Sequence, residues 1–209
     1  MARAISTKTL LDKCYELFAF TGIWFDVFGE ISKGGIWIIY GDEKNGKTTY
    51  GLKLAEYLSN FEQVWYISAE EGTGFEFQQT AKRLNVSATN PNIKWQDYIE
   101  IPEVIKKLQR RQAPKILFLD NATVYQDDLK NGVLRKLLKD FPNTTIILLA
   151  HMEKNEPYTA TAKLAKKLAK IIIRVEGLTA FVSGRCPGGS IIIDEKKAML
   201  SHGTKTQTP

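Results

Sequence analysis

The stretch IWIIYGDEKNGKTT, residues 36–49, is the most informative segment of the chain about its fold. Its first five residues form a β-branched and aromatic run that is typical of a buried strand. The segment GDEKNGKT then matches the pattern G-x-x-x-x-G-K-[ST], and a helical pattern follows from Lys47 to about Asn60. Strand, glycine-containing loop and helix in this order predict an α/β protein with an anion site at the start of the helix.

Each part of this loop suits a nucleoside triphosphate. Gly41 and Gly46 allow the backbone to curl so that its N–H groups face phosphates, and the helix start adds partial positive charge. Lys47 would place a point charge on the β- and γ-phosphates, and Thr48 would offer a hydroxyl to Mg²⁺. The residues predicted to contact the nucleotide are Gly41, Asp42, Glu43, Lys44, Asn45, Gly46, Lys47, Thr48 and Thr49, although Lys44 is equally consistent with a solvated lysine.

Strands and helices alternate along the rest of the chain, which favours a mostly parallel sheet covered by helices. Strands are predicted at 63–68, 93–99, 115–120 and 144–150, and closing strands at 171–176, 178–184 and 190–200 predict an antiparallel extension. Helices are predicted at 5–20, 75–84, 101–112, 126–141 and 160–170, with a loop at 21–35. We expect an N-terminal helix or appendage at 1–20, one core at 21–200 and a polar, flexible tail at 201–209.

Composition narrows the class of protein. Apolar residues are 44% and charged residues 25%, the balance of a soluble globular protein. No run of about 18 uncharged apolar residues predicts a membrane span, and the N-terminus lacks the apolar core of a signal peptide. Cys14 and Cys186 lack metal-ligand spacing, so we expect reduced thiols in a cytoplasmic protein. The net charge of +6 is compatible with a polyanionic partner, but equally with solubility alone.

Polar residues follow three of the predicted strands, at the sheet edge where open α/β sheets bind ligands. Asp120 would hold Mg²⁺ through water, and the alternative is a surface carboxylate that caps the next loop. Glu70 and Glu71 could orient a water for attack on the γ-phosphate, with Glu70 preferred, and the alternative is an acidic helix start. His151 could contact the γ-phosphate or be an ordinary strand-end histidine.

Taken in order, these motifs resemble the RecA superfamily of ATPases, especially the branch that holds RecA, bacterial RadA, KaiC and the DnaB-type helicases. The stretch FDVFGEISKGGIWIIYGDEKNGKTT is similar to the family's first core strand and phosphate loop, YISAEEG to the strand that ends in the catalytic Glu, and ILFLD to the Walker B strand. LLAHMEKN resembles the RadA-like strand that ends in His, and LAKIIIRVEG with TAFVSGRCPGGSIIID resembles the closing strands. The resemblance covers roughly residues 21–200.

The resemblance implies ATP and Mg²⁺ as ligands and ATP hydrolysis as the activity. Arg185, in SGR, matches the place of a finger that reaches the ATP of a neighbouring subunit, and Ser183 stands where the family usually has Lys. A surface arginine on a hairpin is the alternative for Arg185. The other residues to which the resemblance gives binding or catalytic roles are Gly41, Gly46, Lys47, Thr48, Glu70, Asp120 and His151.

The same resemblance suggests single-stranded DNA as a partner. In the family, the loop and helix after the strand that ends in His face the DNA axis. Here this segment carries Lys154 and Tyr158, followed by lysines at i, i+3, i+4 and i+7 of the predicted helix, which are Lys163, Lys166, Lys167 and Lys170. Such a stripe would contact phosphates without reading sequence, and Tyr158 could stack a base. The alternative is the solvated polar face of an amphipathic helix.

The chain departs from RecA itself in having only short candidates for the DNA-binding loops, NATVYQDD and MEKNEPYT. It is similar in this to small RecA-like ATPases of phages and mobile elements, which implies a role in recombination, annealing or replication and assembly into a ring or filament. Two alternatives stay open. One is a hexameric helicase-like motor, and the other is a KaiC-like, nucleotide-gated assembly protein with no DNA role.

Overall fold

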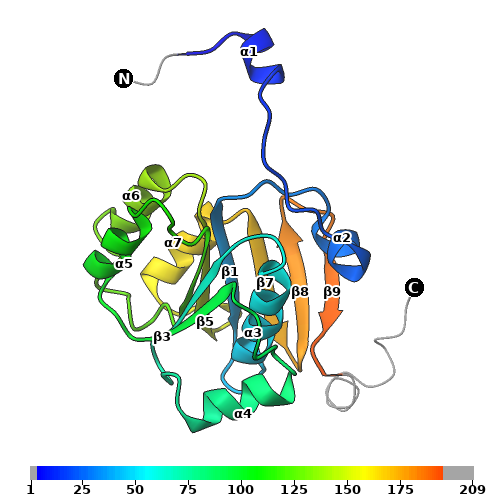
Figure 1. Ribbon diagram of the computed structural model, residues 1–209, viewed down its shortest axis with the longest axis vertical. Coiled ribbons are helices and arrows are strands. Elements are labelled where there is room, and N and C mark those ends of the chain that lie inside the picture. Colours follow the sequence, from blue (N-terminus) through cyan, green and yellow to red (C-terminus); the bar gives the residue numbers. More distant parts are fainter. Residues whose placement is uncertain (1–3, 195–209) are drawn as a thin grey trace.

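The computed structural model describes residues 4–194, and within them one sheet organises the chain (Figure 1). Its strand order is β3-β2-β4-β5-β1-β7-β8-β9, and β6 pairs with β5 off this path. The strands are β1 Gly35–Gly41, β2 Val64–Ser68, β3 Ile93–Asp97, β4 Ile116–Asp120, β5 Thr145–Glu153, β6 Glu156–Pro157, β7 Ile171–Glu176, β8 Thr179–Gly184 and β9 Gly189–Ile192.

The predicted fold class is confirmed. All strand pairs from β3 to β7 along this order are parallel, whereas β8 and β9 continue the sheet in the antiparallel sense. The turn between β7 and β8 passes through Gly177 and Leu178, both with positive φ. Parallel strands need crossover connections, and helices supply them here.

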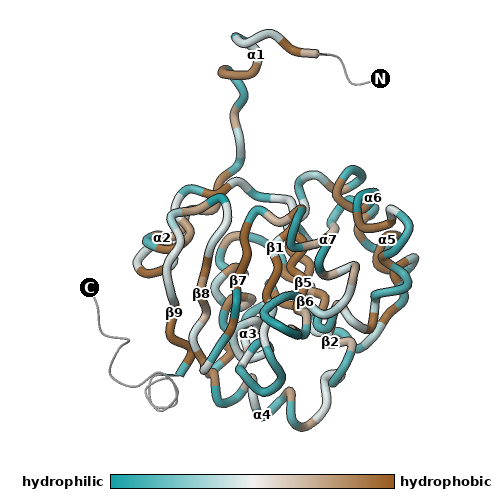
Figure 2. Tube along the Cα trace, turned by 180° about the vertical axis from the view of Figure 1, so that it is seen from behind, coloured by the Kyte–Doolittle hydropathy of each residue, from teal (hydrophilic) through white to brown (hydrophobic). Residues whose placement is uncertain are grey.

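Helices cover both faces of the sheet (Figure 1). They are α1 Thr7–Leu11, α2 Gly22–Phe28, α3 Lys47–Leu58, α4 Phe75–Arg83, α5 Ile101–Leu108, α6 Val133–Asp140 and α7 Ala160–Leu168. The helices α2, α3 and α4 contribute to one apolar cluster, and α5, α6 and α7 contribute to the other. Figure 2 shows the hydrophobic strands enclosed between more polar outer segments. Burial on both faces explains why the parallel strands are nearly continuous apolar runs.

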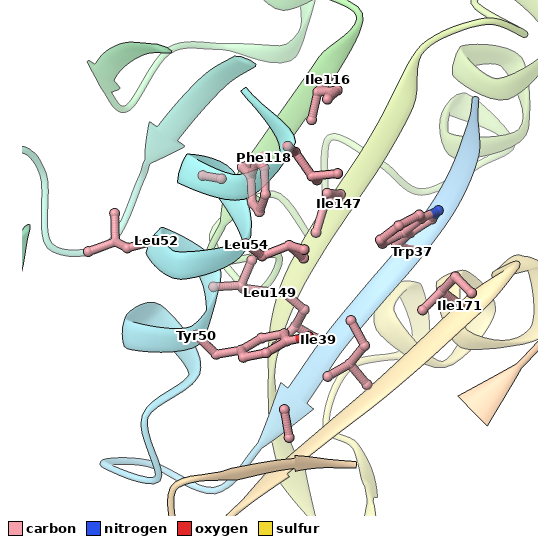
Figure 3. Packing of buried hydrophobic residues seen from close by; sticks show 14 of the residues in the cluster. Trp37, Ile39, Tyr50, Leu52, Leu54, Ile116, Phe118, Ile147, Leu149 and Ile171 are labelled. Atoms are coloured by element: carbon pink, nitrogen blue, oxygen red, sulfur yellow. The ribbon is translucent and has the colours of Figure 1, made fainter. Parts of the chain in front are cut away.

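The central strand β1 is packed from both sides. Trp37 and Ile39 belong to the first cluster, and Ile36 and Ile38 belong to the second, because side chains alternate along a strand. Figure 3 shows Ile39 beside Tyr50 of α3 on the first face. Each such side chain stabilises the fold by roughly 1.5–3 kcal/mol when fully buried. The loop that leaves β1 at its carboxyl end therefore starts from a rigid base.

The N-terminal segment differs from its prediction. A helix was expected over 5–20, but α1 spans only Thr7–Leu11 and buries none of its residues. It stands away from the body of the molecule (Figures 1 and 2). The chain then runs extended to Phe18 and Phe20, whose rings pack against the core residue Trp37. Most of the apolar residues whose spacing suggested a helix are exposed, as at Leu10, Leu11 and Leu17, and only Phe18 among them enters the core.

The segment 21–35 contains a helix, α2, where a loop was predicted. The ring of Trp24 stacks on Tyr57 of α3 at 4.5 Å between centroids, and that of Phe28 stacks on Trp37 at 5.2 Å. Helical geometry places Trp24 and Phe28 on one face, four residues apart. Tertiary aromatic contacts therefore form a helix that the short, glycine-bounded sequence did not indicate.

Three other boundaries are corrected. The helix predicted at 126–141 starts only at Val133, because Gly132 before it has φ 89° and residues 126–132 form turns. The helix predicted to end at residue 112 ends at Leu108. The last predicted strand, 190–200, is observed as Gly189–Ile192, and its part beyond 194 and the predicted tail at 201–209 lie outside the described residues. Within residues 4–194, no helix has the length and apolarity needed to cross a membrane.

Candidate functional site

The loop 41–49 connects β1 to the N-terminus of α3, as predicted. Its two glycines are required for different reasons. A Cβ on Gly41 would lie 2.2 Å from the carbonyl oxygen of Val175 in β7, so a side chain there would separate two paired strands. Gly46 has φ 94°, and its Cβ would meet Leu178 at 2.5 Å. Glycine therefore permits both the close approach of β7 and the left-handed turn before the helix.

Lys47 is the first residue of α3 and folds back over the loop. Its Nζ donates a hydrogen bond to the carbonyl oxygen of Asp42 at 2.7 Å. Burial lowers the pKa of the Lys47 ammonium, and the nearby carboxylates, with Asp120 and Glu70 foremost, oppose this shift. The ammonium thus lies between the loop and the acidic groups at the ends of the neighbouring strands.

The strand order brings distant segments to this loop. Strands β2, β4, β5 and β1 are consecutive neighbours in the sheet, and all four are parallel. Ser68 pairs with Asp120 in register, and Gly41 pairs with His151. Because the carboxyl ends of parallel strands share one edge, the residues that follow β2 and β4 lie beside the phosphate loop. The polar residues predicted at three strand ends therefore line one pocket, although His151 lies within β5, which continues to Glu153.

Asp120 is buried and held by a tyrosine. The Tyr66 hydroxyl donates a hydrogen bond of 2.7 Å to Oδ2 of Asp120. Burial raises the pKa of Asp120 to about 6, and Glu71 and Glu70 add to this rise. Hydrogen bonds from Tyr66 and from the Thr48 side chain act in the opposite direction. Such a carboxylate gains from a cation placed beside it.

Glu70 receives two polar contacts on one oxygen. The Nδ2 of Asn121 donates to Oε2 of Glu70 at 2.7 Å, and Nε2 of His151 lies 3.3 Å from the same oxygen. The Nδ1 of His151 is buried without a hydrogen-bond partner among the described residues. Glu71, the next residue, is exposed. The structure thus brings Glu70 and His151 together and adds Asn121, a residue that the sequence analysis did not select.

These groups surround a pocket of about 370 Å³. It is lined by Glu43, Lys44, Gly46, Lys47, Thr48, Thr49, Glu70, Glu71, Thr80, Asp120, Asn121 and His151. Ten of these were predicted, whereas Thr80 and Asn121 were not. Asp42 is exposed beside the pocket, and Asn45 lies within the loop itself. Tyr66, behind Asp120, was missed because an aromatic residue inside an apolar strand has the appearance of core.

The oxygen donors of the pocket fit Mg²⁺. Thr48 and Asp120 offer a hydroxyl and a carboxylate beside each other, which are ligands that a hard cation prefers. Within residues 4–194, no group of three or more His, Cys, Asp or Glu side chains could hold a metal ion by itself. Two protein ligands suit an ion that keeps several waters and binds together with phosphate oxygens.

A second pocket, of about 320 Å³, adjoins the first and shares Thr49 with it. Its other lining residues are Lys53, Arg83, Leu84, Asn85, Leu178, Ile193 and Asp194. Its apolar side chains, Leu84, Leu178 and Ile193, are of the kind against which a flat aromatic ring can pack. No short motif marks this pocket, since its residues come from α3, from the end of α4 and the residues after it, from the β7–β8 turn and from the residues after β9.

Known proteins resemble this chain in sequence and in fold. No protein-family model matches the sequence. The DNA repair protein RadA of Aquifex aeolicus is 28% identical over 105 residues, which are 50% of this chain and 23% of RadA. The flagellar accessory protein FlaH from Methanocaldococcus jannaschii has a TM-score of 0.61 at 17% identity, with 86% of this chain and 95% of FlaH covered. A KaiC-like protein from Pyrococcus horikoshii has a TM-score of 0.54 at 15% identity, with 78% of this chain and 84% of that chain covered.

The chain has a RecA-like fold. The resemblance inferred from the ordered motifs is thereby confirmed at the level of the fold. The aligned part of RadA is less than a quarter of its length, so what the whole of RadA does is not transferred by this match.

Arg185 lies far from the pocket of its own chain. It follows β8, which runs antiparallel to β7, and its backbone N–H donates to the carbonyl oxygen of Lys170 just before β7. The phosphate loop is at the other end of these strands, about 20 Å away at roughly 3.3 Å per residue. Arg185 is exposed. Arg185 therefore does not reach the nucleotide pocket of its own chain.

The predicted lysine stripe is corrected, because its members have different surroundings. Lys163 and Lys167 are exposed on α7. Lys166 forms an ion pair with Glu156 and lies over the ring of Tyr40. Lys170 lies beyond the end of α7, and its Nζ donates to three oxygen atoms of residues 32 and 33. Two of the four lysines, Lys166 and Lys170, therefore have side-chain partners within the protein. Lys154 and Tyr158 on the preceding hairpin are exposed.

Proposed function

We propose that the protein is a Mg²⁺-dependent ATP hydrolase that assembles on single-stranded DNA during recombination, annealing or replication. The observation that carries the hydrolase part is the pocket in which Lys47, Thr48, Asp120 and Glu70 surround one space. A phosphate-binding loop, two oxygen ligands for a cation and a carboxylate for water are the parts that phosphoryl transfer to water needs.

Each residue has a distinct role in this proposal. The backbone N–H groups at the start of α3 and the Lys47 ammonium bind the phosphates and stabilise charge in the transition state. Thr48 and Asp120 hold Mg²⁺, which neutralises phosphate charge when bound. Glu70 orients the attacking water, and His151, beside it, reports the γ-phosphate to the hairpin that follows β5. Glu71 and Lys44 remain at the rim of the pocket.

Two features favour self-association into a ring or filament. If Arg185 is the finger that the resemblance implies, its target is the ATP of a neighbouring subunit, because the pocket of its own chain lies at the other end of β7 and β8. The arm around α1 exposes the apolar side chains of Leu10, Leu11 and Tyr15, which are 53%, 76% and 64% exposed. Exposed apolar side chains on a projecting arm are stabilised when a second copy of the chain covers them.

The similarity to a DNA repair protein over half of this chain supports a DNA partner, with the exposed residues Lys154, Tyr158, Lys163 and Lys167 as the contact surface. The internal contacts of Lys166 and Lys170 instead favour an alternative, a KaiC-like assembly protein gated by nucleotide and without a DNA role. A helicase-like motor is the third possibility, and strand unwinding would distinguish it.

The test measures ATP hydrolysis with and without single-stranded DNA at low salt. The variant Lys163→Ala/Lys167→Ala removes the two exposed lysines of α7, and Lys136→Ala/Lys139→Ala on α6 is the control, since it removes the same charge from another exposed helix face. We expect DNA to stimulate hydrolysis in the wild type and the control but less in the α7 variant. Hydrolysis that ignores DNA in all three would support the assembly protein, and no hydrolysis under any condition would refute the ATPase.

A further inference from the structure

Asn121 occupies a fixed position next to the predicted catalytic carboxylate. It follows Asp120 at the end of β4 and is only 2% exposed, so water cannot easily replace its contacts. The flanking backbone is tied to both neighbouring strands, because the carbonyl of Asp120 accepts from the N–H of Ala69 and the N–H of Ala122 donates to the carbonyl of Leu149. The side chain therefore projects from a part of the sheet that has little freedom to move.

Hydrogen bonds also fix which way the amide faces. The Oδ1 of Asn121 accepts from the backbone N–H of Thr123 at 2.9 Å. The Nδ2 must then be the atom that faces Glu70, and it donates to Oε2 at 2.7 Å. A hydrogen bond to an ionised acceptor is about twice as strong as one between neutral groups. Asn121 thus supplies a directed donor to one oxygen of Glu70.

We propose that Asn121 is a positioning residue for ATP hydrolysis, which holds Oε2 of Glu70 so that Oε1 is left to accept a proton of the attacking water. This inference rests on the proposed function. Glu70 follows β2 in a turn and its side chain is half exposed, so its backbone and burial restrain it little. The contacts on Oε2 come from Asn121 and from His151, while no donor contacts Oε1 within residues 4–194. A misplacement of about 1 Å in such a group can cost 100-fold in rate.

The test compares two variants of Asn121. Asn121→Asp keeps the shape and the acceptor for Thr123 and removes only the donor to Glu70, which it replaces by a like charge. Asn121→Ala removes both contacts. We expect both to lower kcat by about 10- to 100-fold with little change in the KM for ATP, because the phosphate loop is intact. Asn92→Ala is the control, since it removes another side-chain hydrogen bond, to Ser59, from a residue outside the pocket.

A double-variant measurement separates positioning from a structural role. In a Glu70→Gln background, adding Asn121→Ala should change the residual rate of hydrolysis by less than twofold, because the two residues act through one group. A full additional loss in that background would overturn the inference and assign Asn121 a different role. A wild-type or raised kcat in Asn121→Asp would also overturn the inference. A raised kcat would mean that the hydrogen bond from Asn121 slows hydrolysis by restraining Glu70.

Hydrolysis by the wild type, by Glu70→Gln and by the Asn121 variants distinguishes a failed role of Asn121 from the absence of ATPase activity. Wild-type hydrolysis that Glu70→Gln abolishes, with Asn121 variants unaffected, overturns only the inference. Absence of wild-type hydrolysis with Mg²⁺ and ATP, both with and without single-stranded DNA, overturns both.

Discussion

Replacing Tyr66 by phenylalanine is expected to change how stability and hydrolysis depend on pH, with little change in packing. The Tyr66 ring is fully buried and stacks on Phe118 at 5.0 Å between centroids, and phenylalanine keeps both features. What is lost is the hydroxyl that donates to Oδ2 of Asp120 at 2.7 Å. This hydroxyl lowers the pKa of Asp120, whereas burial raises it. Removal of the hydroxyl therefore destabilises the ionised form of Asp120 and raises its pKa.

The magnitude follows from the strength of that bond. A hydrogen bond to a charged group contributes roughly 1.5–3 kcal/mol, and each pH unit is equivalent to about 1.4 kcal/mol. The variant should therefore raise the pKa of Asp120 above its present value of about 6 by roughly one to two pH units.

The direction in which stability changes with pH follows from the pKa of Asp120 in the folded and unfolded states. The pKa of Asp120 is 3.8 in ordinary surroundings and about 6 in the fold, so the folded state binds the proton more tightly. Below about pH 4 the carboxyl is protonated in both states and does not change stability. As pH rises from there through about 6, the free energy of unfolding falls by roughly 3 kcal/mol in all. In Tyr66→Phe the fall continues to higher pH. The stability difference from the wild type should be small at pH 5 and larger, by roughly 1.5–3 kcal/mol, at pH 8.5.

The assay is urea unfolding at these two pH values without nucleotide or Mg²⁺, followed by hydrolysis measured against pH. At low Mg²⁺, the acid limb of hydrolysis should lie one to two pH units higher in the variant, and saturating Mg²⁺ should bring the two curves together, because the ion competes with the proton for the carboxylate. An equal stability loss at both pH values would show that the Tyr66 hydroxyl does not favour the ionised form of Asp120, and so would an acid limb at the same pH in both proteins.

Further predictions concern the loop, the base and the neighbouring subunit. Lys47→Ala should abolish hydrolysis and weaken binding of a fluorescent ATP analogue. Glu70→Gln should still bind the analogue, but its rate of hydrolysis should fall at least 100-fold. A fully active Glu70→Gln would show that another group activates water. Gly41→Ala should destabilise the fold by about 1–3 kcal/mol in urea unfolding, because its Cβ would meet the carbonyl of Val175 at 2.2 Å, and an unchanged midpoint would contradict that contact. Arg185→Ala should lose hydrolysis in the assembled state, and mixing it with Lys47→Ala should restore a fraction of the rate if the finger acts between subunits.

The parts of the site that sequence could predict are those encoded within a few residues. The loop from Gly41 to Thr49 needs glycines, a lysine and a hydroxyl at fixed spacing, and this spacing is visible without the fold. Asp120 was found for a similar reason, because a buried strand followed directly by a carboxylate is a local pattern. Asn121 carries no such signal, because its importance depends on Glu70, which is 51 residues away in the chain.

Helix boundaries show the same division. α3 begins at Lys47 as predicted, since the loop and the helix pattern are contiguous. α2 was missed because it is stabilised by rings of other elements, such as Tyr57, and the expected N-terminal helix is mostly absent because Phe18 and Phe20 reach the core in an extended chain. Hydrophobic periodicity indicates which residues of a segment are apolar, but it does not indicate which residues of other elements they contact.

The local sequence is sufficient to predict a phosphate loop between a buried strand and a helix, and an alternation of strands and helices that produces a parallel sheet. The folded chain is needed to see that β4 and β5 lie between β2 and β1, which brings Glu70, Asp120 and His151 to one pocket. It is also needed to see that Lys166 and Lys170 have side-chain partners within the protein. The difference arises because backbone conformation and alternation of polarity are local properties of the chain, whereas strand order and the partners of each polar side chain depend on burial and pairing between distant segments.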